Sequence, residues 1–533
     1  MAATMRFCAI VLACVLAPAW AQVPEAPVQE SPRFDIKRFV VEGNTLVSSE
    51  ELARRVAPFV GEKRSFADVQ LAQDAVQEAY REEGWGAVQV LLPEQELVEG
   101  VIRFRVIEGK LGKLDIKATP FHDAENIAGS LPSLKPGQTP SLRHLAEDLS
   151  IANENPSKRT TVTLRAGERE DEVDAVATLE DSNPLKFYVT LDNSGDKQTG
   201  ESRLGFGVQQ SNLWNRDHVL TAQYVTSPEN VSDVTIVGLG YHVPLYGRNG
   251  SLDFLLGYSD VDSGTVQNLF NVTGKGYLAL ARYNLYLPRL GEGYEQRLSF
   301  GLDYRAYESQ VLLTGTTGSL VPDYTVHPAS LTYSGIWRGP ESNASVYASA
   351  FQNIPGGNDG RESDFVGNNF GGRFGASDDY NLLRFGGQGS ASFGEGFLTR
   401  AVFNAQYTGY ALVSAEQFGL GGIDSVRGFR QRILANDKGY QGSLEAYTLD
   451  LGRKLGVESL TLRGVAFYDF GGLRRNDALP GEATSQFLSS WGLGLQGGFL
   501  GLSFRLYYAD LINTNNVPSE SIERWQGALV WVF

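Results

Sequence analysis

The stretch WQGALVWVF, residues 525–533, decides the fold class. At a spacing of two residues, one face of this segment carries Trp525, Gly527, Leu529, Trp531 and Phe533, and the other carries Gln526, Ala528, Val530 and Val532. A strand that has lipid on one side and an aqueous lumen on the other needs one apolar face and one polar or small face. The segment therefore predicts a strand of a membrane β-barrel.

The same alternation occurs upstream. Leu502, Phe504, Leu506 and Tyr508 alternate with smaller or polar residues, and so do Trp491, Leu493 and Leu495. Only a closed barrel leaves no unpaired strand edge in hydrocarbon, so residues 184–533 are expected to close into a barrel. Strands of ~10 residues with their turns and loops allow roughly 14–18 strands, and we expect about 16 antiparallel ones. A large soluble β-sandwich or propeller is the alternative, since it also alternates.

Composition excludes several classes of function. Among 533 residues the only cysteines are Cys8 and Cys14, so the body of the chain offers no thiolate metal site, disulfide framework or cysteine nucleophile. The formal net charge of −16 argues against a general nucleic-acid binder. The five histidines are scattered, and neither a G-x-S-x-G elbow nor a phosphate-binding loop is present. We expect no catalytic, cofactor or metal site, and no enzyme.

The first residues resemble an export signal. Arg6 is the only charge in residues 1–21, an apolar run from Phe7 to Leu16 follows, and Ala19-Trp20-Ala21 offers a small-x-small cleavage site. We expect a signal peptide over 1–21; lipidation of Cys14 is the alternative. Residues 22–33 carry three prolines and are expected to form a linker, too short and too interrupted for a helix that could fill a pore.

Residues 34–183 predict two similar modules, 34–109 and 110–183, each with the element order β-α-α-β-β. In the first, Ser65 and Asp68 form a variant of the capping box before a helix. Phe66, Val69, Gln73, Val76 and Tyr80 fall on one face of that helix. In the second module, Leu142, Leu145, Leu149 and Ala152 mark the corresponding helix.

Several motifs together resemble a known family. VEGNT at 41–45, LPEQELVEG at 92–100 and VIEG at 106–109 resemble the first POTRA domain of two-partner secretion transporters, the TpsB group of ShlB/FhaC/HecB-like proteins. LDNSG at 191–195 resembles the opening barrel strand of that group. GGIDSVRGF at 421–429 resembles its signature loop, which folds back into the lumen, and FYDFG at 467–471 resembles the wall motif that receives this loop. The motifs occur in family order over nearly the whole chain.

The alternation of side chains along a strand explains part of the wall motif without the resemblance. Phe467, Asp469 and Gly471 share a strand face. An acid is costly on the lipid side, so Asp469 should point into the lumen, where Arg427 could grip it with two bonds. Gly428 permits a tight backbone beside it. The resemblance implies that Val426, Arg427, Gly428 and Phe429 lock onto Phe467, Asp469 and Gly471. The alternative is that Arg427 is one loop arginine among many.

The resemblance also implies a function and a place. The protein would lie in the outer membrane of a Gram-negative bacterium with its POTRA domains in the periplasm. These would capture an unfolded partner exoprotein of the haemolysin or adhesin type, with an exposed sheet edge as a binding mode, and the barrel would pass it outward. POTRA modules that are mere spacers, a barrel-assembly insertase, and a passive porin or receptor are the alternatives.

Two further expectations concern the loop and the last strand. Because we expect no pore-filling helix before the first POTRA domain, the loop around Arg427 is the main candidate gate. Leu529, Trp531 and Phe533 resemble the signal by which the outer-membrane assembly machinery recognises barrels, and an interfacial aromatic belt is the simpler interpretation. The expected partners are therefore the exoprotein, outer-membrane lipids and the assembly machinery, without nucleic acid.

Overall fold

The computed structural model describes residues 32–197, 199–266, 270–291, 293–308, 322–366, 372–394 and 396–533. The expected signal peptide, Cys14 and nearly all of the expected linker lie outside these residues. The chain divides into two compact units, the first running to Glu83 and resuming over Val88–Glu108, and the second comprising Gly84–Ala87 and Gly109–Phe533. Each unit is described by itself.

The first unit has the element order expected for residues 34–109. In chain order its elements are β1 (Phe34–Ile36), β2 (Arg38–Glu42), α1 (Ser49–Val56), η1 (Ala57–Phe59), β3 (Gly61–Arg64), α2 (Phe66–Glu82), β4 (Val88–Leu91) and β5 (Val101–Glu108). β2 pairs in parallel with β5, and β4 pairs antiparallel with β5, which gives a three-stranded sheet of order β2-β5-β4. The small β1–β3 pair is an addition that the sequence did not predict.

Helix α2 begins as its sequence requires. The Asp68 carboxylate accepts hydrogen bonds from the Ser65 backbone N–H and hydroxyl, both at 2.8 Å, which completes the capping box. Val69, Val76 and Tyr80 are buried. Phe66, which the sequence places on the same face, is the first helical residue, and its exposure is 51%.

A second β-α-α-β-β module opens the second unit. Its elements are β6 (Lys110–Ile116), α3 (Ala124–Gly129), α4 (Leu142–Ala152), β7 (Lys158–Ala166) and β8 (Glu172–Asp181). The sheet has the order β6-β8-β7, with β6 parallel and β7 antiparallel to β8. Its order and strand directions are those of the first module, so the internal repeat is present in structure as well as in sequence. Its core includes Leu111, Ile127, Leu145 and Ala175.

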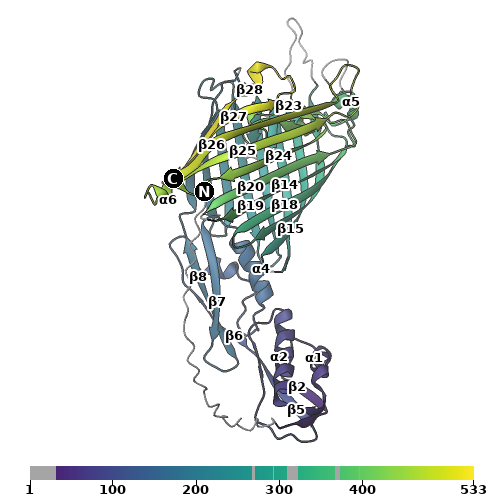
Figure 1. Cartoon of the computed structure of the whole chain (residues 1–533), viewed down its shortest axis with the longest axis vertical. Coiled ribbons are helices and arrows are strands. Elements are labelled where there is room, and N and C mark those ends of the chain that lie inside the picture. The colour runs from purple at the N-terminus through teal and green to yellow at the C-terminus, as the bar shows by residue number, and fades with distance from the viewer. Residues whose placement is uncertain are drawn as a thin grey trace, which may run out of the picture. The chain divides into compact units, whose positions relative to one another are not determined.

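A closed antiparallel barrel of sixteen strands follows, within the part of the chain that the structure describes (Figure 1). Strands β9 and β29 pair and close the ring. A short strand, β16 (Tyr324–Val326), pairs with the C-terminal end of β15. The wall strands are β9 (Leu185–Asp192), β10 (Arg203–Leu213), β11 (His218–Thr226), β12 (Thr235–Leu245), β13 (Gly250–Val266), β14 (Phe270–Leu290), β15 (Tyr294–Glu308), β17 (Pro328–Arg338), β18 (Ser342–Asn353), β19 (Asn381–Phe393), β20 (Phe397–Tyr407), β24 (Lys438–Tyr447), β25 (Leu460–Arg474), β26 (Ser485–Phe499), β27 (Leu502–Asn513) and β29 (Trp525–Val532).

The wall alternates as the last strand predicted. Leu529, Trp531 and Phe533 are exposed at 42%, 53% and 61%, whereas Gln526 is 5% exposed and points inward. The backbones of Phe533 and Phe187 exchange two hydrogen bonds beyond the β9–β29 ladder. Among the described residues, none of the helices combines the length and the apolar character needed to span a bilayer.

Residues 408–437, which connect β20 to β24, carry the sequence's signature loop. They include η2 (Ser414–Glu416), β21 (Phe418–Leu420), β22 (Gly428–Phe429) and β23 (Leu434–Asn436). β21 pairs with β23, and β22 pairs with β28 (Ile522–Glu523) in the connection before β29. Leu420, Val426 and Phe429 are buried with Leu473 and Leu488 of the wall. The loop thus packs against the inner face of the barrel.

Candidate functional site in the barrel lumen

The wall half of the site lies on β24 and β25. Asp469 and Phe467 of β25 are 0% and 4% exposed and face inward. In the antiparallel register, Ser443 of β24 is opposite Asp469, and Glu445 is opposite Phe467. Period two and register therefore bring two carboxylates, a hydroxyl and an aromatic ring to one patch of the lumen surface.

Arg427 supplies the loop half. Its Nε donates to Asp469 Oδ2 and its Nη2 donates to Asp469 Oδ1, both at 2.7 Å, so that the guanidinium grips the carboxylate with two bonds. The Arg427 backbone N–H also donates to Asp469 Oδ2 at 3.1 Å. Ser443 Oγ donates to Asp469 Oδ1 at 2.7 Å and accepts from Arg427 Nη2 at 2.9 Å. The pairing expected from the two motifs is present, and it is buried on both sides.

Aromatic rings and a second acid surround the guanidinium. The Arg427 Cζ lies 3.6 Å from the Phe467 ring centroid and 4.8 Å from that of Tyr507, both within the range of a cation–π contact. Arg427 Nη2 also lies 2.9 Å from Glu445 Oε1. A planar guanidinium can stack on a ring while it binds a carboxylate through two parallel bonds, which a lysine ammonium cannot do. The site therefore fits arginine better than lysine.

The loop backbone next to Arg427 fits the wall closely. Gly428 has φ +93°, and a Cβ there would lie 2.6 Å from Leu511 Cδ2. Gln526 of β29 donates to the Phe429 carbonyl at 2.8 Å and accepts from the Gly428 N–H at 3.2 Å. At Gly471 a Cβ would lie 2.5 Å from Leu420 Cδ2 of the loop. Both glycines allow loop and wall to approach more closely than a side chain would permit.

The structure thus brings together Val426, Arg427, Gly428 and Phe429 of the loop with Phe467, Asp469 and Gly471 of the wall, whereas Leu529, Trp531 and Phe533 are exposed on the last strand. Sequence reasoning missed Ser443, Glu445, Tyr507 and Gln526. Each lies on the inward face of its strand, so alternation could have placed it in the lumen. Its proximity to Arg427 depends on strand register, which the sequence does not state.

An acid beside the loop has a raised pKa. Glu523 of β28 lies in the connection between β27 and β29, outside the wall strands, and its Oε1 accepts from Asn193 Nδ2 at 2.7 Å. Burial raises the pKa of Glu523 from 4.5 to about 7; Arg430 opposes the shift and Glu201 adds to it. A raised pKa favours the docked loop while the acid is neutral, and this contribution is lost as pH rises through about 7.

This contribution of Glu523 is fully present below about pH 4.5, and its last part is lost between about pH 6 and pH 8.5, so we expect the loop to be released more readily at about pH 8.5 than at about pH 6. The measurement is the rate of tryptic cleavage after Arg430 and Arg432 in the purified protein, taken as the ratio of wild type to Glu523→Gln at each pH, so that the enzyme's own pH dependence cancels. A ratio that does not change with pH would contradict the assignment.

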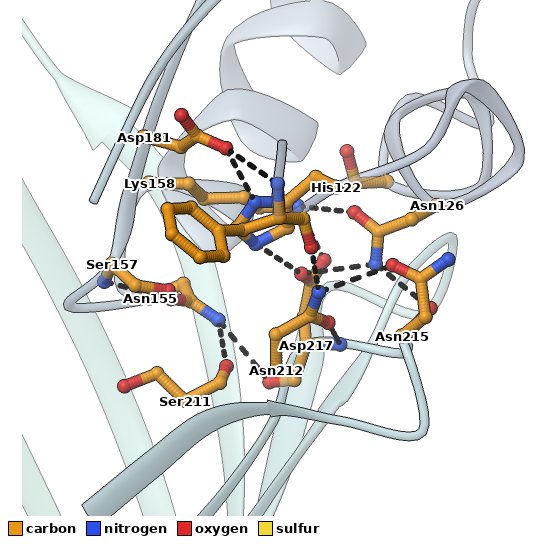
Figure 2. Close-up of polar contacts among 12 residues, drawn as sticks. His122, Asn126, Asn155, Ser157, Lys158, Asp181, Ser211, Asn212, Asn215 and Asp217 are labelled. Atoms are coloured by element: carbon orange, nitrogen blue, oxygen red, sulfur yellow. Dashed lines mark hydrogen bonds and ion pairs between the residues drawn. The ribbon is translucent and has the colours of Figure 1, made fainter. Parts of the chain in front are cut away.

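A second buried polar cluster lies within the second unit, between its β-α-α-β-β module and the barrel turns (Figure 2). Asp217, in the turn from β10 to β11, is 1% exposed and is paired with the buried Lys158 of β7. Tyr246 donates to Asp217 Oδ2 at 2.6 Å, and Asn126 Nδ2 donates to Asp217 Oδ1 at 3.1 Å. His122 Nε2 lies 3.8 Å from Asp217 Oδ1.

Backbone contacts complete this junction. Asn155 Nδ2 donates to the Ser211 carbonyl at 2.6 Å, and Asn212 Nδ2 donates to the Phe121 carbonyl at 2.8 Å. Burial lowers the pKa of Lys158, and the Asp217 carboxylate offsets part of that shift. The module is therefore joined to the barrel turns by a buried charged pair and by several hydrogen bonds around it.

Among the described residues, no group of three or more histidine, cysteine, aspartate or glutamate side chains is placed to hold a metal ion. The polar clusters of the described part are instead ion pairs and hydrogen-bonded networks between segments. What this arrangement can do is hold or release a loop inside a pore.

Comparison with known proteins gives two family matches. A model described as "POTRA domain, ShlB-type" matches residues 34–109. A model described as "Haemolysin secretion/activation protein ShlB/FhaC/HecB" matches residues 172–497, more than half of the chain.

The individual relatives have low sequence identity to this chain. The outer membrane transporter CdiB of Escherichia coli O6:K15:H31 (strain 536 / UPEC) is 25% identical over 491 residues, covering 89% of this chain and 79% of CdiB. The solved structure of CdiB from Escherichia coli aligns with a TM-score of 0.79 at 21% identity, over 96% of this chain and 93% of that one. BamA from Haemophilus ducreyi lacking POTRA domains 1–3 aligns with a TM-score of 0.51 at 15% identity, over 94% and 100%.

Proposed function

This chain belongs to the haemolysin secretion/activation family ShlB/FhaC/HecB and is an outer-membrane transporter of two-partner secretion; on that premise, we propose that the Arg427–Asp469 pair is the lock of its export gate. The family acts with secreted partner exoproteins, and its members carry their POTRA domains in the periplasm. Beyond membership of the family, we propose the roles of single residues, the domain boundaries and the nature of the partner.

The gate is inferred from the buried docking of loop 408–437 against the barrel wall. Arg427 is 3% exposed and Asp469 0%. A charge pair that is held by two bonds and backed by Ser443 is stable in place, and breaking it leaves an uncompensated buried charge. The loop therefore has a well-defined docked state, and export requires that it leave this state or shift within the lumen.

The POTRA modules are proposed to receive the exoprotein before it enters the pore. We assign them to 34–109 and 110–183, after a signal peptide over 1–21 and a linker over 22–33, with the barrel over 184–533. In each three-stranded sheet the outer strands, β2 and β4 or β6 and β7, leave an edge to which an extended chain can add. Main-chain bonds would then bind an unfolded haemolysin- or adhesin-like partner with little dependence on its sequence.

We propose that the protein has neither a catalytic activity nor a cofactor. The polar clusters of the described residues are occupied by partners within the chain, which supports a mechanical role. The outer-face residues Leu529, Trp531 and Phe533 are proposed to contact outer-membrane lipids and to be recognised by the assembly machinery, since all three are exposed on the last strand.

A barrel-assembly insertase is the second candidate that the sequence left open. The family model over residues 172–497 describes secretion proteins, and the likeness to BamA, with a TM-score of 0.51, is weaker than that to CdiB. Secretion is therefore the function that the comparisons favour.

The test compares proteins of the culture medium between cells with and without this protein. Loss of one large exoprotein from the medium, together with its accumulation or degradation in the periplasm, is the expected result. An unchanged medium with several outer-membrane barrels reduced in amount would overturn it in favour of assembly. Removal of residues 34–183 should abolish secretion, whereas it would leave simple solute flux intact in a porin.

A further inference from the structure

The lumenal loop has buried charges besides Arg427, among them Glu416 and Asp437. Glu416, the last residue of η2, lies in the first limb of the loop and is 2% exposed. A carboxylate this deeply buried requires a cation and hydrogen bonds. The signature motif does not include it, and the Arg427 site does not use it.

The cation comes from β15. Arg305 is 3% exposed, and its Nη1 lies 2.6 Å from Glu416 Oε1. Its Nη2 is paired with Asp303 of the same strand, whose side chain is fully buried and is also paired with Arg282 of β14. The Arg305 guanidinium is therefore oriented by its contact with Asp303 of the wall, independently of its contact with Glu416.

Two further wall strands hold the same loop residue. The Nη2 atom of Arg384, on β19, lies 3.4 Å from Glu416 Oε2. Gln406 of β20 donates from Nε2 to the carbonyls of Glu416 and Asp437, both at 2.9 Å, and accepts from Arg384 Nε at 2.8 Å. Because Asp437 is the last residue before β24, this amide ties the two ends of the loop together.

The two buried contacts involve different wall strands. Glu416 is held by β15, β19 and β20, and Arg427 is held by β24 and β25, with β20 and β24 adjacent in the ring. Among the described residues, the polar contacts of Glu416 and those of Arg427 share no residue. The loop is therefore fixed to two adjoining sectors of the wall through separate sets of residues.

We propose that Glu416 and Arg305 form a second anchor of the lumenal loop, so that the loop is a brace attached at two sectors of the barrel rather than a plug held by the Arg427 lock alone. This inference rests on the proposed gate: opening then requires both anchors to yield. Glu416 and Arg305 are positioning residues, since they act through the place of the loop.

The test uses Glu416→Gln, which keeps the shape of the side chain and removes its charge. The readout is tryptic cleavage after Arg430 and Arg432 in intact cells, with the fragments mapped by mass spectrometry. We expect cleavage to rise about tenfold, because the neutral amide leaves the buried Arg305 without its loop partner. Unchanged cleavage would overturn the second anchor.

The matched control is Glu201→Gln. Glu201 also pairs with a loop arginine, Arg430, at 3.0 Å, but its side chain is 55% exposed. An exposed pair contributes little, so cleavage should stay within about twofold of wild type. Heat-modifiable migration of the folded barrel, measured for each variant, separates a released loop from a barrel that failed to assemble.

The double variant Glu416→Gln/Arg427→Ala tests whether the anchors are independent. Since they share no contacting residue, their effects should multiply, to roughly the product of the two single increases. Cleavage no higher than in Arg427→Ala would mean that one lock governs the loop, and the brace would be wrong. Secretion is scored separately: if cleavage multiplies while secretion is unchanged, the brace stands and the proposed gate fails.

Discussion

Arg427→Ala is expected to remove most secretion of the partner exoprotein while the barrel still assembles. The change leaves Asp469 and Glu445 buried without the guanidinium between them, at a cost of about 3–5 kcal/mol for a broken buried pair. A loop that has lost its fixed position populates many conformations in the lumen and obstructs the path of an extended chain. The measurements are the exoprotein in the medium and tryptic cleavage after Arg430 and Arg432 in intact cells, which should rise.

Two companion variants make this result specific. Arg505→Met removes another arginine that joins wall to loop, through Asp424 at 2.6 Å, but there the acid is 73% exposed, so little change is expected. Arg427→Lys keeps the charge but cannot grip both oxygens of Asp469 or lie flat against Phe467, so an intermediate defect is expected. Unchanged secretion and cleavage in Arg427→Ala would remove the lock from the mechanism.

Lys158→Met is expected to loosen the junction between the second module and the barrel turns. It strips the lysine cation from Asp217, which is 1% exposed and keeps the hydrogen bonds from Tyr246 and Asn126. Loss of one member of a buried pair costs about 3–5 kcal/mol. Since about 1.4 kcal/mol is tenfold, hydrogen exchange of residues 211–217 should rise by at least roughly 100-fold. Secretion should fall, since delivery to the pore depends on where this module lies.

The double variant Lys158→Met/Asp217→Asn serves as the control. It removes both charges, and the carbonyl of the substituted amide would still accept from the Tyr246 hydroxyl. Removing a whole buried pair is less damaging than removing half of it. Exchange in the double variant should therefore lie closer to wild type than in Lys158→Met. If the double variant exchanges as fast as the single one, packing rather than charge balance holds the junction.

Alternation and a few ordered motifs were enough to predict the architecture. The apolar face of residues 525–533 predicted a lipid-facing strand, and that strand closes the barrel against β9. Asp469 could be placed in the lumen because a charge on the lipid side of a strand is costly. Arg427 could be paired with it because a buried carboxylate needs a cation, and the resemblance of two motifs indicated which cation.

The partners of these residues could not be predicted in the same way. Glu416 and Arg305 are 111 residues apart, and Lys158 and Asp217 are 59 apart, and no local pattern connects either pair. Each contact depends on strand register and on the course of an irregular segment. Phe66 shows the limit of periodicity itself: it shares the helical stripe of Val69 and Val76, but at the first turn of α2 the stripe is half exposed.

The pairing of β22 with β28 has a consequence for the order in which the protein matures. Phe429 depends on Gln526 of the final strand, 97 residues further along the chain, and Gly428 pairs with Glu523 just before it. Contacts between residues so far apart in the chain close large loops and form late in folding. The loop's seat is therefore incomplete until β29 is paired in the wall, and a barrel with β29 displaced would hold the loop more loosely.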